Sequence, residues 1–176
     1  GAAAGGGAAG GLGGRRRGGG LVGLARLPGL GVLLAGAILG ARRGALAVLL
    51  WILVGTIGLP VFANGKAGLP VLVGPTGGYI LGFVVGAAII GAVATVAVRR
   101  AGRGTVWVLT AGGLLALLVV HAAGIVGLHL RAGLGWQAAA TVDGAFWIGD
   151  LVKLAATVLV AGAVHRAFPD LLRRRT

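Results

Sequence analysis

Long apolar stretches alternate along the chain with short segments that carry the charged residues. Three of these stretches, 44–65, 67–98 and 104–130, contain no Asp, Glu, Lys or Arg. About 20 consecutive apolar residues are enough to cross a bilayer as an α-helix. The pattern therefore predicts a polytopic membrane protein of the all-α class, built as a bundle of transmembrane helices.

The apolar stretches predict five membrane spans, at about 29–41, 43–59, 78–98, 106–129 and 148–166. The Gly- and Pro-rich segment 61–77 is predicted to be a loop, and the Gly-containing stretch 130–147 to be irregular. Residues 1–27 begin as almost pure Gly, Ala and Arg, which cannot bury enough side chain to fold alone. We expect them to form a disordered or degenerate leader. A signal peptide is the less favoured alternative, since the apolar pattern simply continues into further spans.

The composition excludes a soluble enzyme. Hydrophobic residues make up 57% of the chain, charged residues only 11%, and the mean hydropathy is +1.01, whereas a soluble domain has about a quarter charged residues. No nucleophile–base or carboxylate pair is available away from the membrane. There is no cysteine, and the spacing of His121, His129 and His165 does not form a metal-ligand cluster. We therefore expect no enzymatic activity, cofactor or metal.

The net charge of +13 reports on membrane orientation. In a soluble chain it would suggest nucleic acid, but here the arginines lie between apolar runs, so we expect no nucleic-acid partner. If the C-terminal arginines are cytoplasmic, Arg42, Arg43 and the segment 99–103 fall on the same side, as the positive-inside rule requires. The arginines of the leader are the exception. With five spans these arginines would lie outside, whereas an even number of spans would place them in the cytoplasm. Either a first helix is therefore missing or the leader is not native-like.

Asp150 and Lys153 are the strongest candidates for a functional site. They lie three residues apart near the start of the last predicted span, so they share one helical face. Ionisable side chains at membrane depth are costly and are candidates for function. A structural ion pair is the alternative, but apolar residues would fill both positions at lower cost. We therefore favour a ligand site.

The segment Gly74–Tyr79 precedes the third predicted span. Its glycines allow close approach of a ligand or a backbone, and a helix that begins there would present free N–H groups. Gly78, Gly82 and Gly86 recur every four residues, which is the small-residue pattern of membrane helix contacts. On this evidence alone, helix packing is the favoured interpretation.

Two further positions carry polar chemistry. His121 lies mid-span and either faces a pocket or bonds a carbonyl of a neighbouring helix. The segment Asn64–Lys66 lacks the residues of a phosphate-binding loop, and Lys66 is predicted to be a solvated loop charge.

Several segments of the chain resemble the BioY family, the biotin-binding S components of energy-coupling factor (ECF) transporters. The resemblance runs in order from about Leu33 to the C-terminus. It rests on Arg42–Leu50, Gly58–Ala63, Gly74–Tyr79, Gly82-Phe83 and Gly149–Lys153. The pairing of Gly-Leu-Pro-Val-Phe-Ala with Gly-Pro-Thr-Gly-Gly-Tyr is specific.

The resemblance implies a bundle of six membrane helices, of which the first is degenerate or missing here, so that residues 28–176 form the BioY-like domain. It also implies a biotin pocket near the outer face of the plasma membrane. It further implies that the chain docks on an ECF transmembrane coupling subunit, which works with two ATPase subunits to take up biotin. The family has a Pro where this chain has Ile148.

The family's Asp-x-x-Lys motif corresponds to Asp150 and Lys153, and Pro75–Tyr79 to a wall of the pocket. The expected ligand-binding residues are Asp150, Lys153, Thr76, Gly77, Gly78, Tyr79, Asn64, His121 and Phe146. Asp150 would accept a ureido N–H, and Lys153 would stabilise the ureido oxygen or the carboxylate. Two alternatives stay open: an S component for another vitamin, and a truncated membrane bundle that does not transport.

Overall fold

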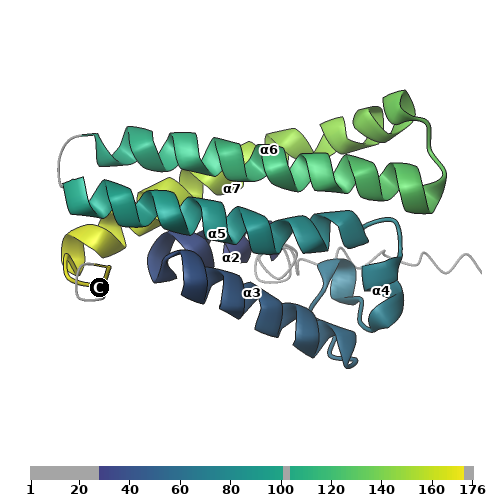
Figure 1. Ribbon diagram of the computed structural model, residues 1–176, viewed down its shortest axis with the longest axis horizontal. Coiled ribbons are helices and arrows are strands. Elements are labelled where there is room, and N and C mark those ends of the chain that lie inside the picture. The colour runs from purple at the N-terminus through teal and green to yellow at the C-terminus, as the bar shows by residue number, and fades with distance from the viewer. Residues whose placement is uncertain (1–27, 101–103, 173–176) are drawn as a thin grey trace, which may run out of the picture.

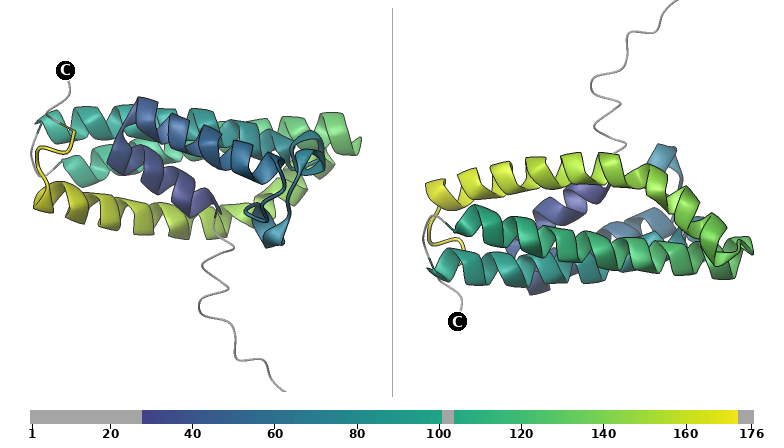
Figure 2. Two further views of the ribbon diagram at one scale, coloured as in Figure 1. Left: turned by 90° about the horizontal axis from the view of Figure 1, so that it is seen from below. Right: turned by 90° about the horizontal axis from the view of Figure 1, so that it is seen from above.

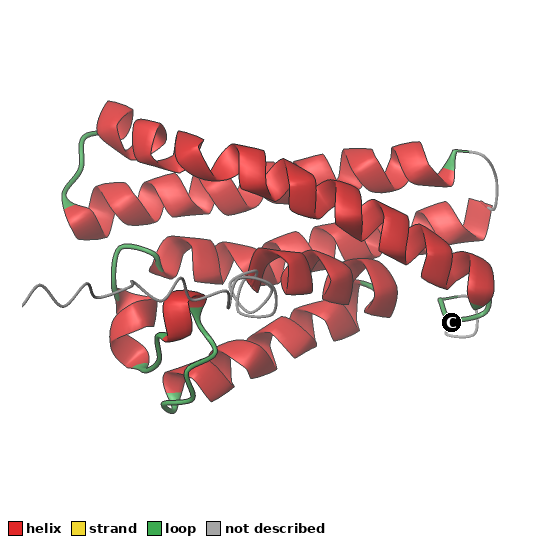
Figure 3. Cartoon of the chain, turned by 180° about the vertical axis from the view of Figure 1, so that it is seen from behind, coloured by secondary structure: helices red, strands yellow, loops and turns green. Residues whose placement is uncertain are grey.

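The computed structural model describes residues 28–100 and 104–172, and within them the chain is helical throughout, without a strand (Figures 1 and 3). The prediction of an all-α bundle is confirmed. The leader 1–27 lies outside the described residues. The elements are α2 (Pro28–Leu39), α3 (Ala41–Thr56), the 3₁₀ turn η1 (Ala63–Gly65), α4 (Leu69–Val73), α5 (Gly77–Arg100), α6 (Thr105–Ala132) and α7 (Trp136–Ala167).

Three of these helices, α5, α6 and α7, are long and apolar enough to cross a membrane, so the chain is a multi-pass membrane protein. Helices α2 and α3 have 12 and 16 residues. At 1.5 Å per residue they extend about 18 and 24 Å, less than the hydrocarbon core of about 30 Å. The five predicted spans thus exist as helices, but the first two are shorter than a full crossing.

Helix α5 is central, because it packs against α6, α2 and α3 and also contacts α4 (Figure 1). Helix α7 closes the other side of the bundle by packing on α6 and α2 (Figure 2). The C-terminal ends of α5 and α7 lie together at one end of the bundle. Helix α4 and the α6–α7 turn lie at the opposite end.

The regularly spaced glycines of α5 form the contact with α6. A Cβ atom on Gly78 would meet the Ala123 carbonyl, one on Gly82 would lie 3.1 Å from the Val120 Cα, and one on Gly86 would lie 2.9 Å from the Val120 Cγ2. Small residues let membrane helices approach closely. The packing interpretation of this pattern is therefore confirmed.

The junction of α2 and α3 is also built from glycines. Gly40 alone joins the two helices, with a φ of 82° that favours glycine. A Cβ on Gly36 would meet the Ala87 carbonyl of α5, and one on Gly44 would lie 2.6 Å from the Gly36 Cα. The short α2–α3 hairpin therefore lies directly against α5.

One prediction about the last part of the chain was wrong. Most of the stretch 130–147 is helical, since α6 continues to Ala132 and α7 begins at Trp136. The alanines after Gln137 favour helix, and Gly144 and Gly149 face open space. His165, near the end of α7, is buried and its Nε2 lies 2.8 Å from the Ala37 carbonyl oxygen of α2.

Gly36→Ala should lower the free energy of unfolding by about 1–3 kcal/mol, because the added methyl group has no room beside α5. Gly31→Ala is the matched control in the same helix, since a Cβ there meets nothing within 4 Å. Thermal unfolding of the purified protein in detergent measures both. Equal stability of the two variants would contradict the close contact between α2 and α5.

Candidate binding site

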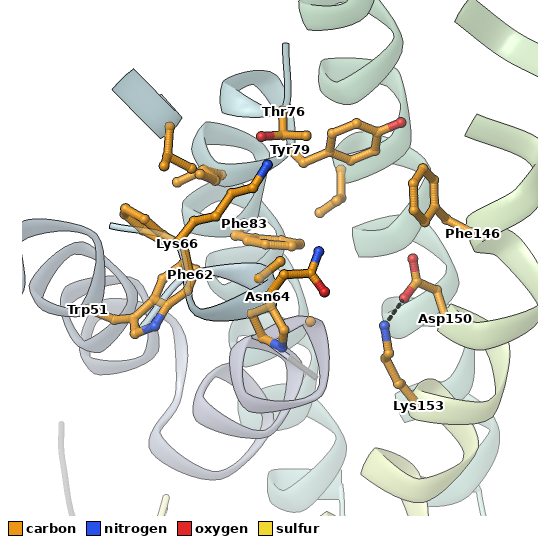
Figure 4. Close-up of a pocket in the computed structure, with 16 residues that line it drawn as sticks. Trp51, Phe62, Asn64, Lys66, Thr76, Tyr79, Phe83, Phe146, Asp150 and Lys153 are labelled. Carbon is orange, nitrogen blue, oxygen red and sulfur yellow. Dashed lines mark hydrogen bonds and ion pairs between the residues drawn. The ribbon is translucent and has the colours of Figure 1, made fainter. Parts of the chain in front are cut away.

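A cavity of about 240 Å³ opens near the end of the bundle that carries η1 and α4. Its walls come from α3, α5, α6 and α7, from the start of α2, and from the segment that contains η1 and α4. Aromatic side chains dominate these walls (Figure 4): Trp51, Phe62, Tyr79, Phe83 and Phe146. The polar side chains at the cavity are few: Asn64, Lys66, Thr76, Asp150 and Lys153. An apolar pocket with a few polar groups is typical of a small-molecule site.

Asp150 and Lys153 form an ion pair on the α7 side of the cavity (Figure 4). The Lys153 Nζ donates a hydrogen bond of 2.7 Å to Asp150 Oδ1, and the side chains are 20% and 17% exposed. Gly29 of α2 lies opposite, and a Cβ there would be 3.7 Å from both Asp150 Oδ1 and Lys153 Nζ. The pair is thus accessible from the cavity and lies against the start of α2.

Behind this pair lies a buried hydrogen-bond network centred on Asp143. Asp143 Oδ1 accepts a bond of 2.7 Å from the Tyr79 hydroxyl and lies 2.7 Å from His121 Nδ1. Asp143 Oδ2 accepts a bond of 3.0 Å from Trp147 Nε1. Asp143 was not singled out from the sequence, and it is only 2% exposed. It lies within α7, where the helix turns it toward α5 and α6.

His121 connects the buried network to the ion pair. Its Nε2 lies 3.3 Å from Asp150 Oδ2, within ion-pair distance although without hydrogen-bond geometry. The imidazole also stacks on Trp147, with ring centroids 4.3 Å apart and an interplanar angle of 13°. The sequence left His121 open between the pocket and a neighbouring helix carbonyl; instead it contacts two carboxylates.

A second aromatic group forms the wall on the α3 side. The Trp51 and Phe62 rings meet edge to face with centroids 5.2 Å apart, and Trp51 Nε1 donates to the Val61 carbonyl at 3.2 Å. Gly55 leaves the space that the Phe62 ring fills. These contacts fix the segment after α3 against the bundle, where it brings Asn64 and Lys66 to the cavity.

Of the expected site residues, six lie on the cavity: Asp150, Lys153, Thr76, Tyr79, Asn64 and Phe146. Gly77, Gly78 and His121 are not among its lining residues. Gly77 packs against the Leu72 carbonyl and the Arg131 guanidinium, and its N–H donates to the Gly74 carbonyl at 3.0 Å. Gly78 packs against α6. The glycines therefore shape helix contacts, and the N–H of Gly77 is already bonded.

Several residues of the site were not predicted from the sequence. Lys66, predicted to be a solvated loop charge, is exposed and also lies on the cavity. Trp51 and Phe83 line the cavity as well. Aromatic residues in apolar helices give no signal of their own, because lipid-facing and cavity-facing positions have the same composition. Phe62 and Phe83 did have a signal, since they lie in the Gly58–Ala63 and Gly82-Phe83 segments that carried the resemblance.

These features define a class of protein: a multi-pass helical membrane protein with a ligand-sized cavity that contains one acid–amine pair. The BioY family model matches residues 26–170. The chain is 38% identical over 148 residues to the biotin transporter BioY of Rhizobium etli, covering 82% of this chain and 79% of that protein. It is 40% identical to the biotin transporter BioY of Rhodobacter capsulatus, covering 85% of this chain and 82% of that protein. The chain therefore belongs to the BioY family.

The fold is also found in a solved structure. The crystal structure of the S-component for biotin from an ECF-type ABC transporter superposes with a TM-score of 0.70, at 23% identity, over 78% of this chain and 72% of that one. The resemblance inferred from the sequence motifs is thus confirmed. Membership of a family of transporters also supports the expectation that the chain is not an enzyme.

Proposed function

We propose that this chain is the membrane-embedded S component that binds biotin for uptake, together with an ECF energising module. The support comes from family membership and from the relatives, which are named as biotin transporters. The observation that carries the proposal is the Asp150–Lys153 pair on an aromatic cavity. The cavity of about 240 Å³ lies below the usual range of about 300–1,000 Å³ for ligand pockets, so it suits only a compact ligand.

The chemistry of biotin matches the groups that face the cavity. Biotin has a ureido group with two N–H donors and a carbonyl acceptor, an apolar thioether ring and an anionic tail. A carboxylate has about four acceptor positions and an ammonium has three donors, so neither group is saturated by the other. In the proposal, Asp150 accepts a ureido N–H, and the aromatic walls pack against the thioether ring.

The two lysines offer separate partners for the ureido oxygen and the anionic tail of biotin. Lys153 lies beside Asp150 on α7, whereas Lys66 projects from the segment around η1 on the opposite side of the cavity (Figure 4). We assign Lys153 to the ureido oxygen. Lys66, together with the neighbouring Asn64, is assigned to the anionic tail, which would lie toward the exposed mouth of the cavity.

Orientation in the membrane follows from the same arrangement. Arg42, Arg43 and Arg99 are exposed, and the C-terminal end of the described chain lies close to the α2–α3 junction, where Leu172 is 3.3 Å from the position of a Gly40 Cβ. By the positive-inside rule this end would be cytoplasmic. The cavity lies toward the opposite end, so it would receive biotin from outside the plasma membrane.

Asp150→Asn and Lys153→Ala should each weaken biotin binding by about 2 kcal/mol or more, because each removes one partner of a partly buried charge pair and leaves the other uncompensated. Isothermal titration of biotin into the purified protein in detergent measures the affinity. Arg166→Ala is the control, since it removes an exposed cation from the same helix away from the cavity. Unchanged affinity in both site variants would remove the assignment.

Two further measurements distinguish the alternatives, an S component for another vitamin and a membrane bundle that does not transport. Competition of labelled biotin against other vitamins would reveal a different cargo if another vitamin displaced it at lower concentration. Uptake in a biotin auxotroph, with and without the ECF coupling and ATPase subunits, would expose a non-transporting bundle. We expect biotin to be preferred and uptake to rise when the energising subunits are present.

The absence of cysteine makes the orientation testable with single introduced thiols. Gly135→Cys at the start of α7 should react with a membrane-impermeant maleimide in intact cells, because both that turn and the cavity are proposed to face outward. Ala167→Cys at the end of the same helix should react only after permeabilisation. Both positions are exposed. The reverse labelling pattern would contradict the orientation.

A further inference from the structure

His121 is a buried histidine held between two carboxylates rather than at the cavity. Its Nδ1 lies 2.7 Å from Asp143 Oδ1 and its Nε2 lies 3.3 Å from Asp150 Oδ2. The side chain is 2% exposed. It comes from α6, whereas both carboxylates come from α7, so the imidazole also joins the two helices.

This geometry favours one charge state of the imidazole, the one in which no nitrogen lone pair faces a carboxylate oxygen. A neutral imidazole has one N–H and one lone pair, whereas an imidazolium has an N–H on each nitrogen. With a neutral ring, one nitrogen lone pair would face a carboxylate oxygen in a buried site. An imidazolium donates a hydrogen bond to Asp143 and places its second N–H beside Asp150, within ion-pair distance, and the cluster of Asp143, Asp150, Lys153 and His121 then has no net charge. Neutral clusters are those that buried sites tolerate.

Asp143 and Trp147 hold His121 on the side away from Asp150. Asp143 is held by donors from three helices, namely Tyr79 of α5, His121 of α6 and Trp147 of α7. The Trp147 ring also covers the face of the imidazole. The contacts thus run in sequence from Asp143 to His121, then to Asp150, and only Asp150 of these three lies on the cavity.

We propose that His121 and Asp143 are positioning residues, which hold the Asp150 carboxylate in the orientation that accepts the ligand. The inference rests on the proposed function and deepens it. His121 acts through Asp150 without touching biotin, and Asp143 acts through His121. Outer partners of this kind affect the affinity of metal sites by about tenfold to a hundredfold, and we expect an effect of that order here.

The proposal has a consequence for pH dependence. The titratable and charged groups that face His121 are Tyr79 from α5 and Asp143, Asp150 and Lys153 from α7. If the imidazolium loses its proton, its Nε2 presents a lone pair to Asp150 and the carboxylate must turn away. Biotin affinity should therefore fall as pH rises through that titration, while the fold remains intact.

The test is biotin titration across the neutral and alkaline range with His121→Gln, which keeps a polar side chain but cannot carry the charge. We expect the dissociation constant to rise by about tenfold or more and the pH dependence of the wild-type protein to disappear. His165→Gln is the control, because His165 is also buried and bonded, but to the Ala37 carbonyl away from the cavity. It should keep the wild-type affinity and pH profile.

A second measurement does not depend on the variant folding. The chain has only three histidines, so ¹⁵N-histidine NMR of the wild-type protein resolves each imidazole. Two protonated ring nitrogens on His121 at neutral pH, with biotin bound, support the inference, and a neutral tautomer overturns it. Equal affinity and an equal pH profile in His121→Gln also overturn it, and the proposed function then survives. Failure of the wild-type protein to bind biotin refutes the proposed function itself, and this inference with it.

Discussion

The ion pair between Asp150 and Lys153 is the interaction on which the account depends. Two opposite charges in an apolar membrane domain lose hydration that their mutual attraction does not fully replace. The structure reduces this cost with a 2.7 Å hydrogen bond and with the buried His121–Asp143 couple behind it. It does not bury the pair completely, because one side remains open to the aromatic cavity. A pair kept only for stability would need no such opening.

Close helix packing makes this polar cluster possible. The glycines of α5 bring that helix against α6, and Gly124 of α6 leaves the space that the Tyr79 ring occupies. The Tyr79 hydroxyl then reaches Asp143 of α7 across the bundle. Larger residues at the glycine positions would separate the helices and leave a buried carboxylate with fewer donors, which is costly. The glycines of α5 and α6 thus serve the site as well as the fold.

Much of this was predictable from the sequence, because the signals are local. Long apolar runs identified α5, α6 and α7, and the isolated charges Asp150 and Lys153 identified the site. Asp143 was missed because its neighbours Thr141 and Gly144 suggested an irregular segment, and because its partners Tyr79 and His121 are 64 and 22 residues away. The cavity wall at Trp51 was missed for another reason: only the packing decides which aromatic side chains face a cavity and which face lipid.

The central claim is that the acid–amine pair exists for a ligand and not for stability. The most direct test replaces both members with apolar residues of similar size, Asp150→Leu together with Lys153→Met, and measures thermal unfolding and biotin binding of the same protein. Exchange of a buried ion pair for apolar residues is often neutral or stabilising. The account predicts a melting temperature equal to or above that of the wild-type protein, with biotin binding lost. A marked loss of stability with biotin binding retained would contradict it.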